Sequence, residues 1–301
     1  MEITVPSPEE KKALAELNSI LLKSEKFVKA HAAEYLIWTG HRNAALKEFL
    51  EEEHLYSAEP KYRVVIWRVL AQAEADPLLK KMWMDKIYQA YTDLDGPDRT
   101  HATETLAKLK QPVADLFPEE TAYTLKSPDR NLQTYALWAS AVDVNGQICK
   151  NKDEFLDKAL RDSDLTIRRI SAFVLRQSKG LNLEQWQKLA SVILTIDPKE
   201  ELYVTLLATV LVTAPTDANQ DILAEIKKIL VKGAKKYSAS QRIDLSQAFA
   251  EKGEEEQLPV LMDILESEED PDARAAAAYG ILKIKGRQIV EDSLNAAESN
   301  K

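Results

Sequence analysis

A charged position, most often arginine, recurs at intervals of 31 to 41 residues along almost the entire chain. Its members are Lys29, Arg63, Arg99, Arg130, Arg168, Glu201, Arg242 and Arg274. Four residues before most of them stands an acid or a helix-capping residue, and seven residues after each of them stands an apolar residue. Repetition at this period is typical of a chain built from stacked units that share one continuous core.

The stretch from Asp153 to Gly180 shows the repeating unit most clearly. Apolar residues stand at helical spacing from Phe155 to Leu160, and a broader apolar stripe begins at Ile167, after an Asp-Ser-Asp turn. The pattern predicts two short amphipathic helices joined by a tight turn. Such a hairpin is too small to bury its apolar stripes alone, so it must pack against its neighbours in the chain.

The recurring acid, charged and apolar positions form three columns when the units are aligned. These columns resemble the HEAT-repeat family, whose units are helical hairpins with an acid, an arginine and an Ala/Leu run in the second helix. The closest stretches begin at Gly96, Asp162 and Asp270, whereas Glu201 and Lys126 depart from the family pattern. The resemblance implies an all-α fold: a right-handed α-α superhelix, or solenoid, of about eight HEAT-like hairpins. It also implies an inter-repeat ladder of arginines paired with acids, or alternatively arginines that face a partner, at Arg63, Arg99, Arg130, Arg168 and Arg274.

The repeat pattern predicts one solenoid over residues 1–286, with a weak joint at 144–153, followed by a polar C-terminal cap and tail at 287–301. The expected hairpins cover residues 8–39, 42–75, 77–110, 112–144, 153–177, 183–213, 217–252 and 254–285. The joint is expected because Asn145, Gly146 and the polar residues after Cys149 interrupt the periodicity.

Composition disfavours several classes of partner. The net charge of −9 repels phosphate backbones and anionic membranes, so no nucleic acid is expected. One cysteine allows neither an internal disulfide nor a multi-cysteine metal site. Without an apolar run of about 18 residues no membrane insertion is expected. The start of the chain lacks the features of a signal peptide, so we expect a cytoplasmic protein; an extracytoplasmic one whose signal was removed would look the same.

Two His-Ala-x-Glu pairs stand on predicted second helices: His31 with Glu34, and His101 with Glu104. Imidazole and carboxylate at this spacing share a helix face and resemble a pair of metal ligands. A whole hairpin separates the two pairs, which puts them about 20 Å apart if neighbouring helices pack about 10 Å apart. We therefore expect no metal and no cofactor, and interpret the histidines as packed side chains or part of a ligand site.

Aromatic residues are concentrated in the first half of the chain, and Trp38, Trp67 and Trp138 are among them. Beside Arg and Glu, exposed rings would suit a sugar or a peptide anchor. The three tryptophans stand at different distances from the repeating charge, so several of them are expected in the core. The possible ligand site therefore comprises His31, Glu34, Trp38, Trp67, His101, Glu104 and Trp138.

Motifs of catalysis are missing from the sequence: it contains no G-x-S-x-G, no Gly-rich phosphate loop and no H-E-x-x-H. We expect no enzyme, but a scaffold that binds a protein or peptide on the surface formed by the second helices. Two alternatives stay open. One is a small-ligand module, for example for a carbohydrate, in the N-terminal half, and the weaker one is a helical-repeat DNA glycosylase. The sequence does not indicate an oligomeric state.

Overall fold

The computed structural model is all-α, as the sequence predicts. It describes residues 6–148, 150–178 and 180–299, and the side chains of these up to residue 288. Within these ranges the only β-type pairing is an isolated bridge between Val142 and Ile148. Cys149 lies outside the described residues.

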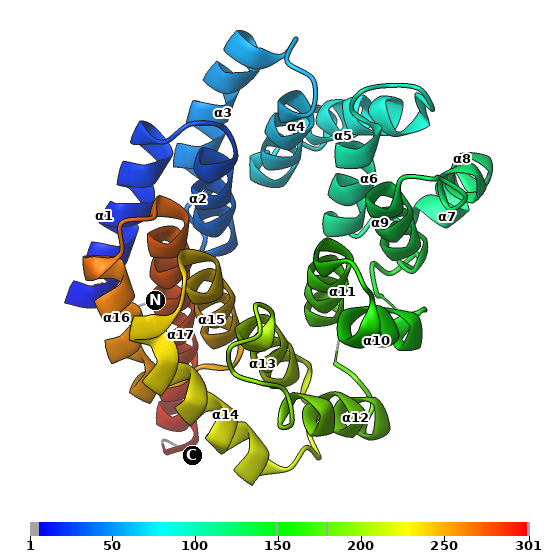
Figure 1. Ribbon diagram of the computed structural model, residues 1–301. Helices are drawn as coiled ribbons and strands as arrows, with labels where there is room; N and C mark the ends of the chain where they lie inside the picture. The colour runs from blue at the N-terminus through cyan, green and yellow to red at the C-terminus, as the bar shows by residue number, and fades with distance from the viewer. Residues whose placement is uncertain (1–5, 149, 179, 300–301) are drawn as a thin grey trace. The chain divides into compact units, whose positions relative to one another are not determined.

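Helices follow one another through the described chain, most of them joined by short turns (Figure 1). The α-helices are α1 Pro8–Lys23, α2 Lys26–Trp38, α3 Arg42–Tyr56, α4 Tyr62–Ala73, α5 Pro77–Thr92, α6 Arg99–Lys108, α7 Val113–Leu116, α8 Pro118–Thr124, α9 Arg130–Ser140, α10 Lys152–Arg161, α11 Leu165–Gln177, α12 Leu183–Ile193, α13 Tyr203–Thr213, α14 Gln220–Gly233, α15 Ala239–Lys252, α16 Leu258–Ser267 and α17 Pro271–Ser299. Two 3₁₀ turns, Ala234–Lys236 and Glu255–Gln257, precede α15 and α16.

Polar caps fix where several helices begin. The Ser7 hydroxyl accepts from the Glu10 backbone N–H, and the Glu10 carboxylate accepts in return from the Ser7 N–H at 2.7 Å. Capping boxes of the same kind open α12 and α15. Each satisfies two backbone groups that the first helical turn leaves unpaired, so the local sequence sets these boundaries.

Contacts divide the chain into two compact units. Unit 1 comprises Met1–Glu48 together with Glu225–Lys301, and unit 2 comprises Phe49–Ala224. The boundaries fall inside α3 and α14. Unit 1 is therefore built from the two ends of the chain.

The C-terminal helix α17 is the centre of unit 1. It packs against α15 and α16, its neighbours in sequence, and also against α1 and α2 (Figure 1, red and blue). Ala273, Ala275, Ala276, Ala277 and Ala278 are completely buried along its first turns. Small side chains let helices approach closely on several sides of α17, which is why it can contact four others.

Polar and aromatic contacts join the first two helices to the last two. Two ion pairs link them, Lys12 with Glu266 at 2.5 Å and Glu16 with Arg274 at 2.7 Å, and the His31 Nδ1 is hydrogen-bonded to Asp272 at 2.9 Å. The Tyr35 and Tyr279 rings stack with centroids 4.6 Å apart. Neighbours in sequence thus account for only part of the packing in unit 1, because the beginning of the chain covers α17.

The last helix extends beyond its expected end. The repeat pattern predicts a hairpin that ends near Lys285 and a polar tail that frays after a last turn around Ile289 and Leu294, whereas α17 continues to Ser299. Arg287, two residues beyond that point, donates to backbone carbonyls at the end of α15, that of Gly253 among them at 2.7 Å. These hydrogen bonds hold the segment after Gly286 against α15, and they offset the roughly 1 kcal/mol by which a helical glycine disfavours the helix.

In unit 2 the second helix of each sequence repeat packs beside the next one. Contacts run from α4 to α6, from α6 to α9, from α9 to α11 and from α11 to α13 (Figure 1). The helices between them in sequence, α5, α10 and α12, pack against this row. Ile87, Phe155 and Trp186 from these helices are each at most 1% exposed, so the core lies between the row and its partners.

The beginning of the joint expected at 144–153 forms an ordered turn, and Cys149 in the same joint lies outside the described residues. Between α9 and α10, the backbone N–H of Asp143 donates to the Gln147 carbonyl at 2.9 Å. The Asp143 carboxylate accepts from the backbone N–H groups of Asn145 and Gln147 at 2.9 and 2.8 Å. An aspartate that closes a turn in this way replaces the hydrogen bonds that a helix would supply.

Candidate functional site

Two arginines of the repeating column make the ion pairs that a ladder requires in unit 2. Arg63 on α4 pairs with Asp98, and its Nε donates to that carboxylate at 2.7 Å. Arg130 on α9 pairs with Asp162 at 2.7 Å. Each pair connects a second helix to the turn of the following repeat. The guanidinium and carboxylate thereby tie successive units together.

Other members of the column bind differently. Arg99 is 4% exposed and donates to the Leu94 carbonyl at 2.7 Å and to the Thr124 hydroxyl. The Arg168 Nε donates to the Ala159 carbonyl at 3.1 Å. The two guanidinium groups donate to carbonyls near helix ends, which have no hydrogen-bond partner within the helix. Any strong donor near a helix C-terminus can make such a bond.

The last arginine of the column, Arg274 on α17, pairs with Glu16 on α1. It also donates to the carbonyls of Glu268 and Glu269, at the end of the preceding turn. Arg242, which the sequence places in the same column, pairs with Glu268. Within unit 1 the pairing therefore continues from the last repeat to the first helix of the chain.

Replacing Asp98 by alanine should lower the free energy of unfolding by about 2 to 3 kcal/mol, because hydrogen bonds to charged groups contribute about this much. The Asp98 side chain is 4% exposed and accepts from both Arg63 and the backbone N–H of Lys61. Urea titration followed by circular dichroism measures the change. The control is Asp157→Ala, because the Asp157 carboxylate is 56% exposed in its ion pair with Arg161. This control should lower the free energy of unfolding by under about 1 kcal/mol. Equal losses in the two variants would contradict the role of Asp98 as a buried partner of Arg63.

Charged and aromatic side chains of the adjacent helices α6, α9 and α11 form one set. They are His101, Glu104, Lys108, Tyr135, Phe173 and Arg176, and all are partly exposed. We call this set the α6–α11 strip. Lys108 donates to Glu104 at 2.7 Å, and its Nζ lies 5.8 Å from the centroid of the Phe173 ring. The Arg176 guanidinium lies at the same distance from that ring.

A buried cation on α4 extends the charge of the strip. Arg68 is 3% exposed, and its Nη1 lies 3.5 Å from the Thr105 hydroxyl on α6. Burial acts to raise the pKa of Glu104, but the positive charges of Lys108 and Arg68 outweigh it and hold that pKa below its ordinary value. Burial raises the pKa of Tyr135, and the charge of Glu104 raises it further. Glu104 is therefore an ionised carboxylate surrounded by cations.

His101 is a neutral imidazole at neutral pH. Burial lowers its pKa below the ordinary value of 6.5, and the charges of Lys61 and Arg68 lower it as well, whereas Glu104 and Asp98 oppose them. The folded state consequently binds a proton at His101 less readily than the unfolded state does. The contribution of neutral His101 to the free energy of unfolding is fully present at pH values above the ordinary pKa of histidine. It decreases as the pH falls below that pKa.

Acidification from about pH 7.5 to about pH 5.5 should therefore destabilise the wild type more than the His101→Gln variant, because glutamine has no proton to gain. The free energy of unfolding, measured by urea titration at several pH values, gives the two slopes. His54→Gln is the matched control, since His54 is exposed on α3. It should keep the wild-type slope, and an unchanged slope in His101→Gln would refute the interpretation.

The three tryptophans of the possible ligand site occupy different environments. Trp138 is 1% exposed, and its ring contacts Phe173 edge-on at 5.7 Å. Trp67 is 8% exposed, and its Nε1 donates to Glu53 at 2.8 Å. Trp38, at the end of α2, is 49% exposed. Only Trp38 offers a ligand a large ring surface, whereas the other two contribute to packing.

The two His-Glu pairs also differ in their surroundings. His31 is hydrogen-bonded to Asp272, and Glu34 is 5% exposed on the same helix. His101 and Glu104 belong to the α6–α11 strip. Among the described residues, no group of three or more His, Cys, Asp or Glu side chains is placed to hold a metal ion.

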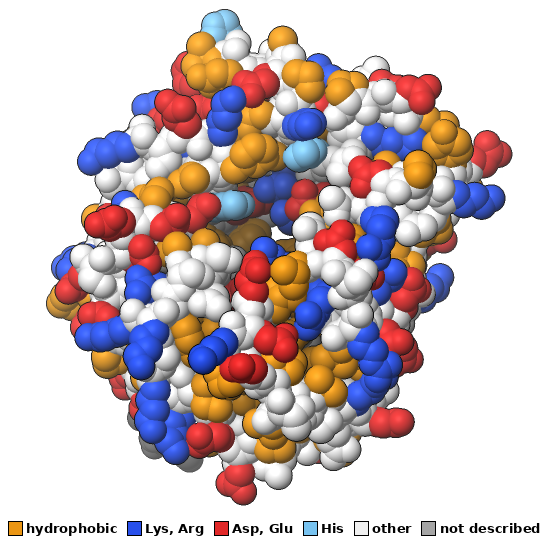
Figure 2. Space-filling model, in the orientation of Figure 1, with side chains coloured by type: hydrophobic (Ala, Val, Ile, Leu, Met, Phe, Trp, Pro, Cys, Tyr) orange, Lys and Arg blue, Asp and Glu red, His pale blue; other side chains and the backbone are white. Residues whose placement is uncertain are grey.

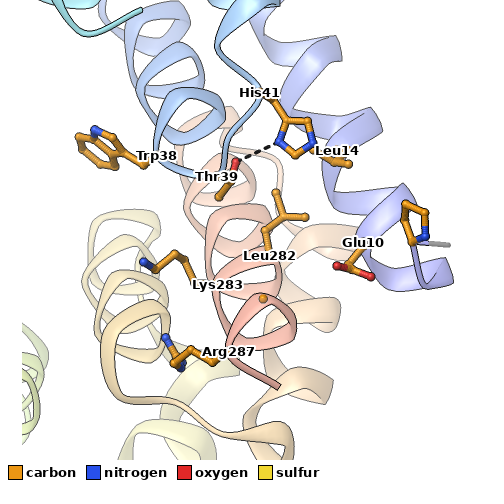
Figure 3. A pocket seen from close by; sticks show the side chains of 10 residues that line it. Glu10, Leu14, Trp38, Thr39, His41, Leu282, Lys283 and Arg287 are labelled. Atoms are coloured by element: carbon orange, nitrogen blue, oxygen red, sulfur yellow. Dashed lines mark hydrogen bonds between the residues drawn. The ribbon is translucent and has the colours of Figure 1, made fainter. Parts of the chain in front are cut away.

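An open pocket of about 510 Å³ lies beside α17 in unit 1. It is lined by Pro6, Glu10, Leu14, Trp38, Thr39, His41, Leu282, Lys283, Gly286 and Arg287. Figure 3 shows Trp38, Lys283 and Arg287 on one side of α17, and Glu10 and Leu14 on the other. The charged side chains do not converge on one point, and Arg287 is already hydrogen-bonded to the end of α15.

Five residues of this region were not among the predicted site residues: the partly exposed Lys108, Tyr135, Phe173 and Arg176, and the buried Arg68. Their common feature is a fixed offset from the repeating charge. Arg68, Glu104, Tyr135 and Phe173 stand five residues after Arg63, Arg99, Arg130 and Arg168, and Lys108, Trp138 and Arg176 stand eight or nine residues after it. Offsets of three to four residues share a helix face, so this column would have identified the strip.

Comparison with protein-family models, with curated proteins and with solved structures finds no match to this chain. No described helix is both long enough and apolar enough to cross a membrane. On the face shown in Figure 2, basic and acidic side chains are interspersed.

Proposed function

We propose that this protein is a non-enzymatic binding scaffold of HEAT-like repeats, with about eight hairpins in a right-handed superhelix. It binds a segment of a protein or peptide on the surface formed by the second helices. The side-by-side packing of α4, α6, α9 and α11 supports the proposal, because consecutive repeats then present their second helices as one surface.

The observation that carries the proposal is the α6–α11 strip. Three helices from separate repeats bring two aromatic side chains and three charged ones into one partly exposed set. Aromatic and arginine side chains dominate the binding energy of protein interfaces. Helices of a packed core hold these side chains in place before a partner arrives, which lowers the entropic cost of binding.

Removal of the aromatic anchors tests this function. Proteins captured by the wild type and by the double variant Tyr135→Ala/Phe173→Ala are compared by quantitative mass spectrometry, and direct binding of the captured candidates is then measured with purified proteins. We expect at least one partner whose affinity falls roughly tenfold or more in the variant, as the loss of 1.4 kcal/mol at an interface implies.

The control for this experiment is Leu165→Ala/Leu194→Ala, which removes two exposed apolar side chains from the same unit. It should bind like the wild type. Thermal melting verifies that all variants are folded. Equal binding by the aromatic variant and the wild type would refute the proposed surface.

A small-ligand site in unit 1 is the second candidate, and the half-exposed Trp38 ring beside the pocket favours it. An exposed indole next to polar side chains suits the face of a sugar ring. Saturation-transfer NMR with a panel of mono- and disaccharides should show binding that Trp38→Ala abolishes and Phe27→Ala, a change of an exposed aromatic on the same helix, preserves. Signals unaffected by Trp38→Ala would exclude this site.

A further inference from the structure

The pocket beside α17 has the size and the lining of a site for a small polar ligand. Its volume of about 510 Å³ lies within the range of about 300 to 1,000 Å³ that is usual for small-molecule sites. Leu14 and Leu282 line it with apolar surface, whereas Thr39 and His41 add groups that form hydrogen bonds. All its lining residues belong to unit 1, so one compact unit forms the whole pocket.

Trp38 presents an exposed aromatic ring to the pocket, and its neighbours hold that ring in place. Trp38 is 49% exposed, and its ring meets the rings of Tyr35 and Tyr279 at steep angles, with centroids 5.7 and 5.8 Å away. The two tyrosines stack on each other, which holds the end of α2 against α17. A ring that is already fixed loses little conformational entropy when a ligand packs against it.

Lys283 brings a positive charge to the same side of α17. It follows Tyr279 by four residues, so the two side chains share one face of the helix. Figure 3 shows Lys283 on the same side of α17 as Trp38. Among the side chains that the structure describes, Lys283 has neither a hydrogen-bond partner nor an ion-pair partner. A ligand in the pocket can therefore bind this ammonium group without displacing another side chain.

The other charged side chains near the pocket have contacts within the protein. Arg287 donates to backbone carbonyls at the end of α15, and the Glu10 carboxylate accepts from a backbone N–H at the start of α1. Glu251 on α15 accepts from the Tyr279 hydroxyl at 3.3 Å and forms no ion pair with Lys283. Of the lysine and arginine side chains that line the pocket, Lys283 is therefore the one whose charge an anionic ligand can balance.

A single ammonium group favours a ligand with one negative charge. A phosphate monoester carries about 1.5 to 2 negative charges at neutral pH, and arginine forks or several backbone N–H groups suit it better. A carboxylate carries one charge, which one lysine balances. A long acidic polysaccharide would in addition be repelled by the net charge of −9 on the chain.

We propose that this pocket binds a sugar that carries one carboxylate, such as a uronic acid. The apolar face of the sugar ring packs against Trp38, and the carboxylate pairs with Lys283. The inference rests on the small-ligand site in unit 1, the second candidate function, and specifies its ligand. The two residues consequently have separable effects, because Trp38 contributes to the affinity for any sugar, whereas Lys283 contributes only to the affinity for the acid.

Saturation-transfer NMR titrations of the full chain with glucuronate and galacturonate, each compared with its neutral amide, test the proposal. At least one acid should bind about tenfold or more tightly than its amide, as expected for a charge-assisted contact. Lys283→Gln should reduce this preference to about twofold or less, and it should leave the affinity for the amide within about twofold of the wild type. Trp38→Ala should abolish the binding of both ligands.

Lys236→Gln is the matched control, because it removes the same charge from an exposed lysine of unit 1 that does not line the pocket. It should keep the wild-type preference for the acid. Thermal melting verifies that every variant is folded. In Lys283→Gln, a loss of affinity for the amide as large as that for the acid would overturn the proposal, and so would an equal loss in both lysine variants. Tighter, Lys283-dependent binding of glucose 6-phosphate would also overturn it.

Failure of this inference differs from failure of the small-ligand site. If the amides bind as tightly as the acids, and Trp38→Ala abolishes the binding of both, the pocket binds sugars but does not select a carboxylate. If no saccharide gives a signal that depends on Trp38, the carbohydrate site itself is refuted. Neither result concerns the α6–α11 strip in unit 2, whose test measures the binding of proteins.

Discussion

Replacing Trp186 by alanine should lower the free energy of unfolding by about 3 to 5 kcal/mol, the usual cost of truncating a buried tryptophan. Trp186 on α12 is 1% exposed, and its Nε1 donates to the Val210 carbonyl on α13 at 2.9 Å. Truncation leaves a cavity between these helices and an unpaired carbonyl. Urea titration followed by circular dichroism measures the loss.

Trp186→Phe separates the effect of the cavity from the effect of the lost hydrogen bond. Phenylalanine keeps most of the apolar volume but cannot donate to Val210, so we expect a loss of about 1 to 2 kcal/mol. Comparable losses in the two variants would show that the hydrogen bond, rather than the packing, dominates. A change below about 1 kcal/mol in Trp186→Ala would mean that Trp186 does not lie in a packed core.

Replacing Tyr279 by alanine should destabilise the protein by about 3 kcal/mol and loosen a helix at the opposite end of the sequence. Tyr279 on α17 is 7% exposed and stacks on Tyr35 of α2. Without this ring, α2 loses its principal aromatic contact with α17. Hydrogen exchange with mass spectrometry should show faster exchange in α2 as well as in α17.

Tyr279→Phe is the control, because it keeps the stacked ring and removes only the hydroxyl that donates to Glu251 at 3.3 Å. It should stay within about 1 kcal/mol of the wild type, with unchanged exchange in α2. If Tyr279→Ala accelerates exchange in α15, α16 and α17 alone, the first helices do not depend on the last one, and the packing in unit 1 is refuted.

Local sequence signals predict many of the helices well. Ser7 and Pro8 mark the start of a helix, and α1 begins at Pro8. The Asp-Ser-Asp turn separates α10 from α11 as expected. These signals succeed because capping and amphipathic periodicity act between residues at most four positions apart. The helix α17 runs past the last turn that we expect near Leu294, and Arg287 hydrogen-bonds to the end of a different helix, a contact that local signals do not reveal.

The candidate site was predicted only in part. His101 and Glu104 were identified from their spacing on one helix, and they belong to the strip. Trp67 and Trp138 were included although they are buried. Spacing along one helix cannot tell which of its faces the next helix covers, so burial is decided by packing between repeats.

By itself, the sequence determined an all-helical chain, because helix periodicity and capping are local properties. Only the tertiary structure decided that α17 packs against α1 and α2, that Arg68 and Lys108 lie near Glu104, and that Lys108 and Arg176 lie near the Phe173 ring. Such contacts join residues far apart in the chain, and their free energy depends on shape and charge complementarity, which no short stretch of sequence contains.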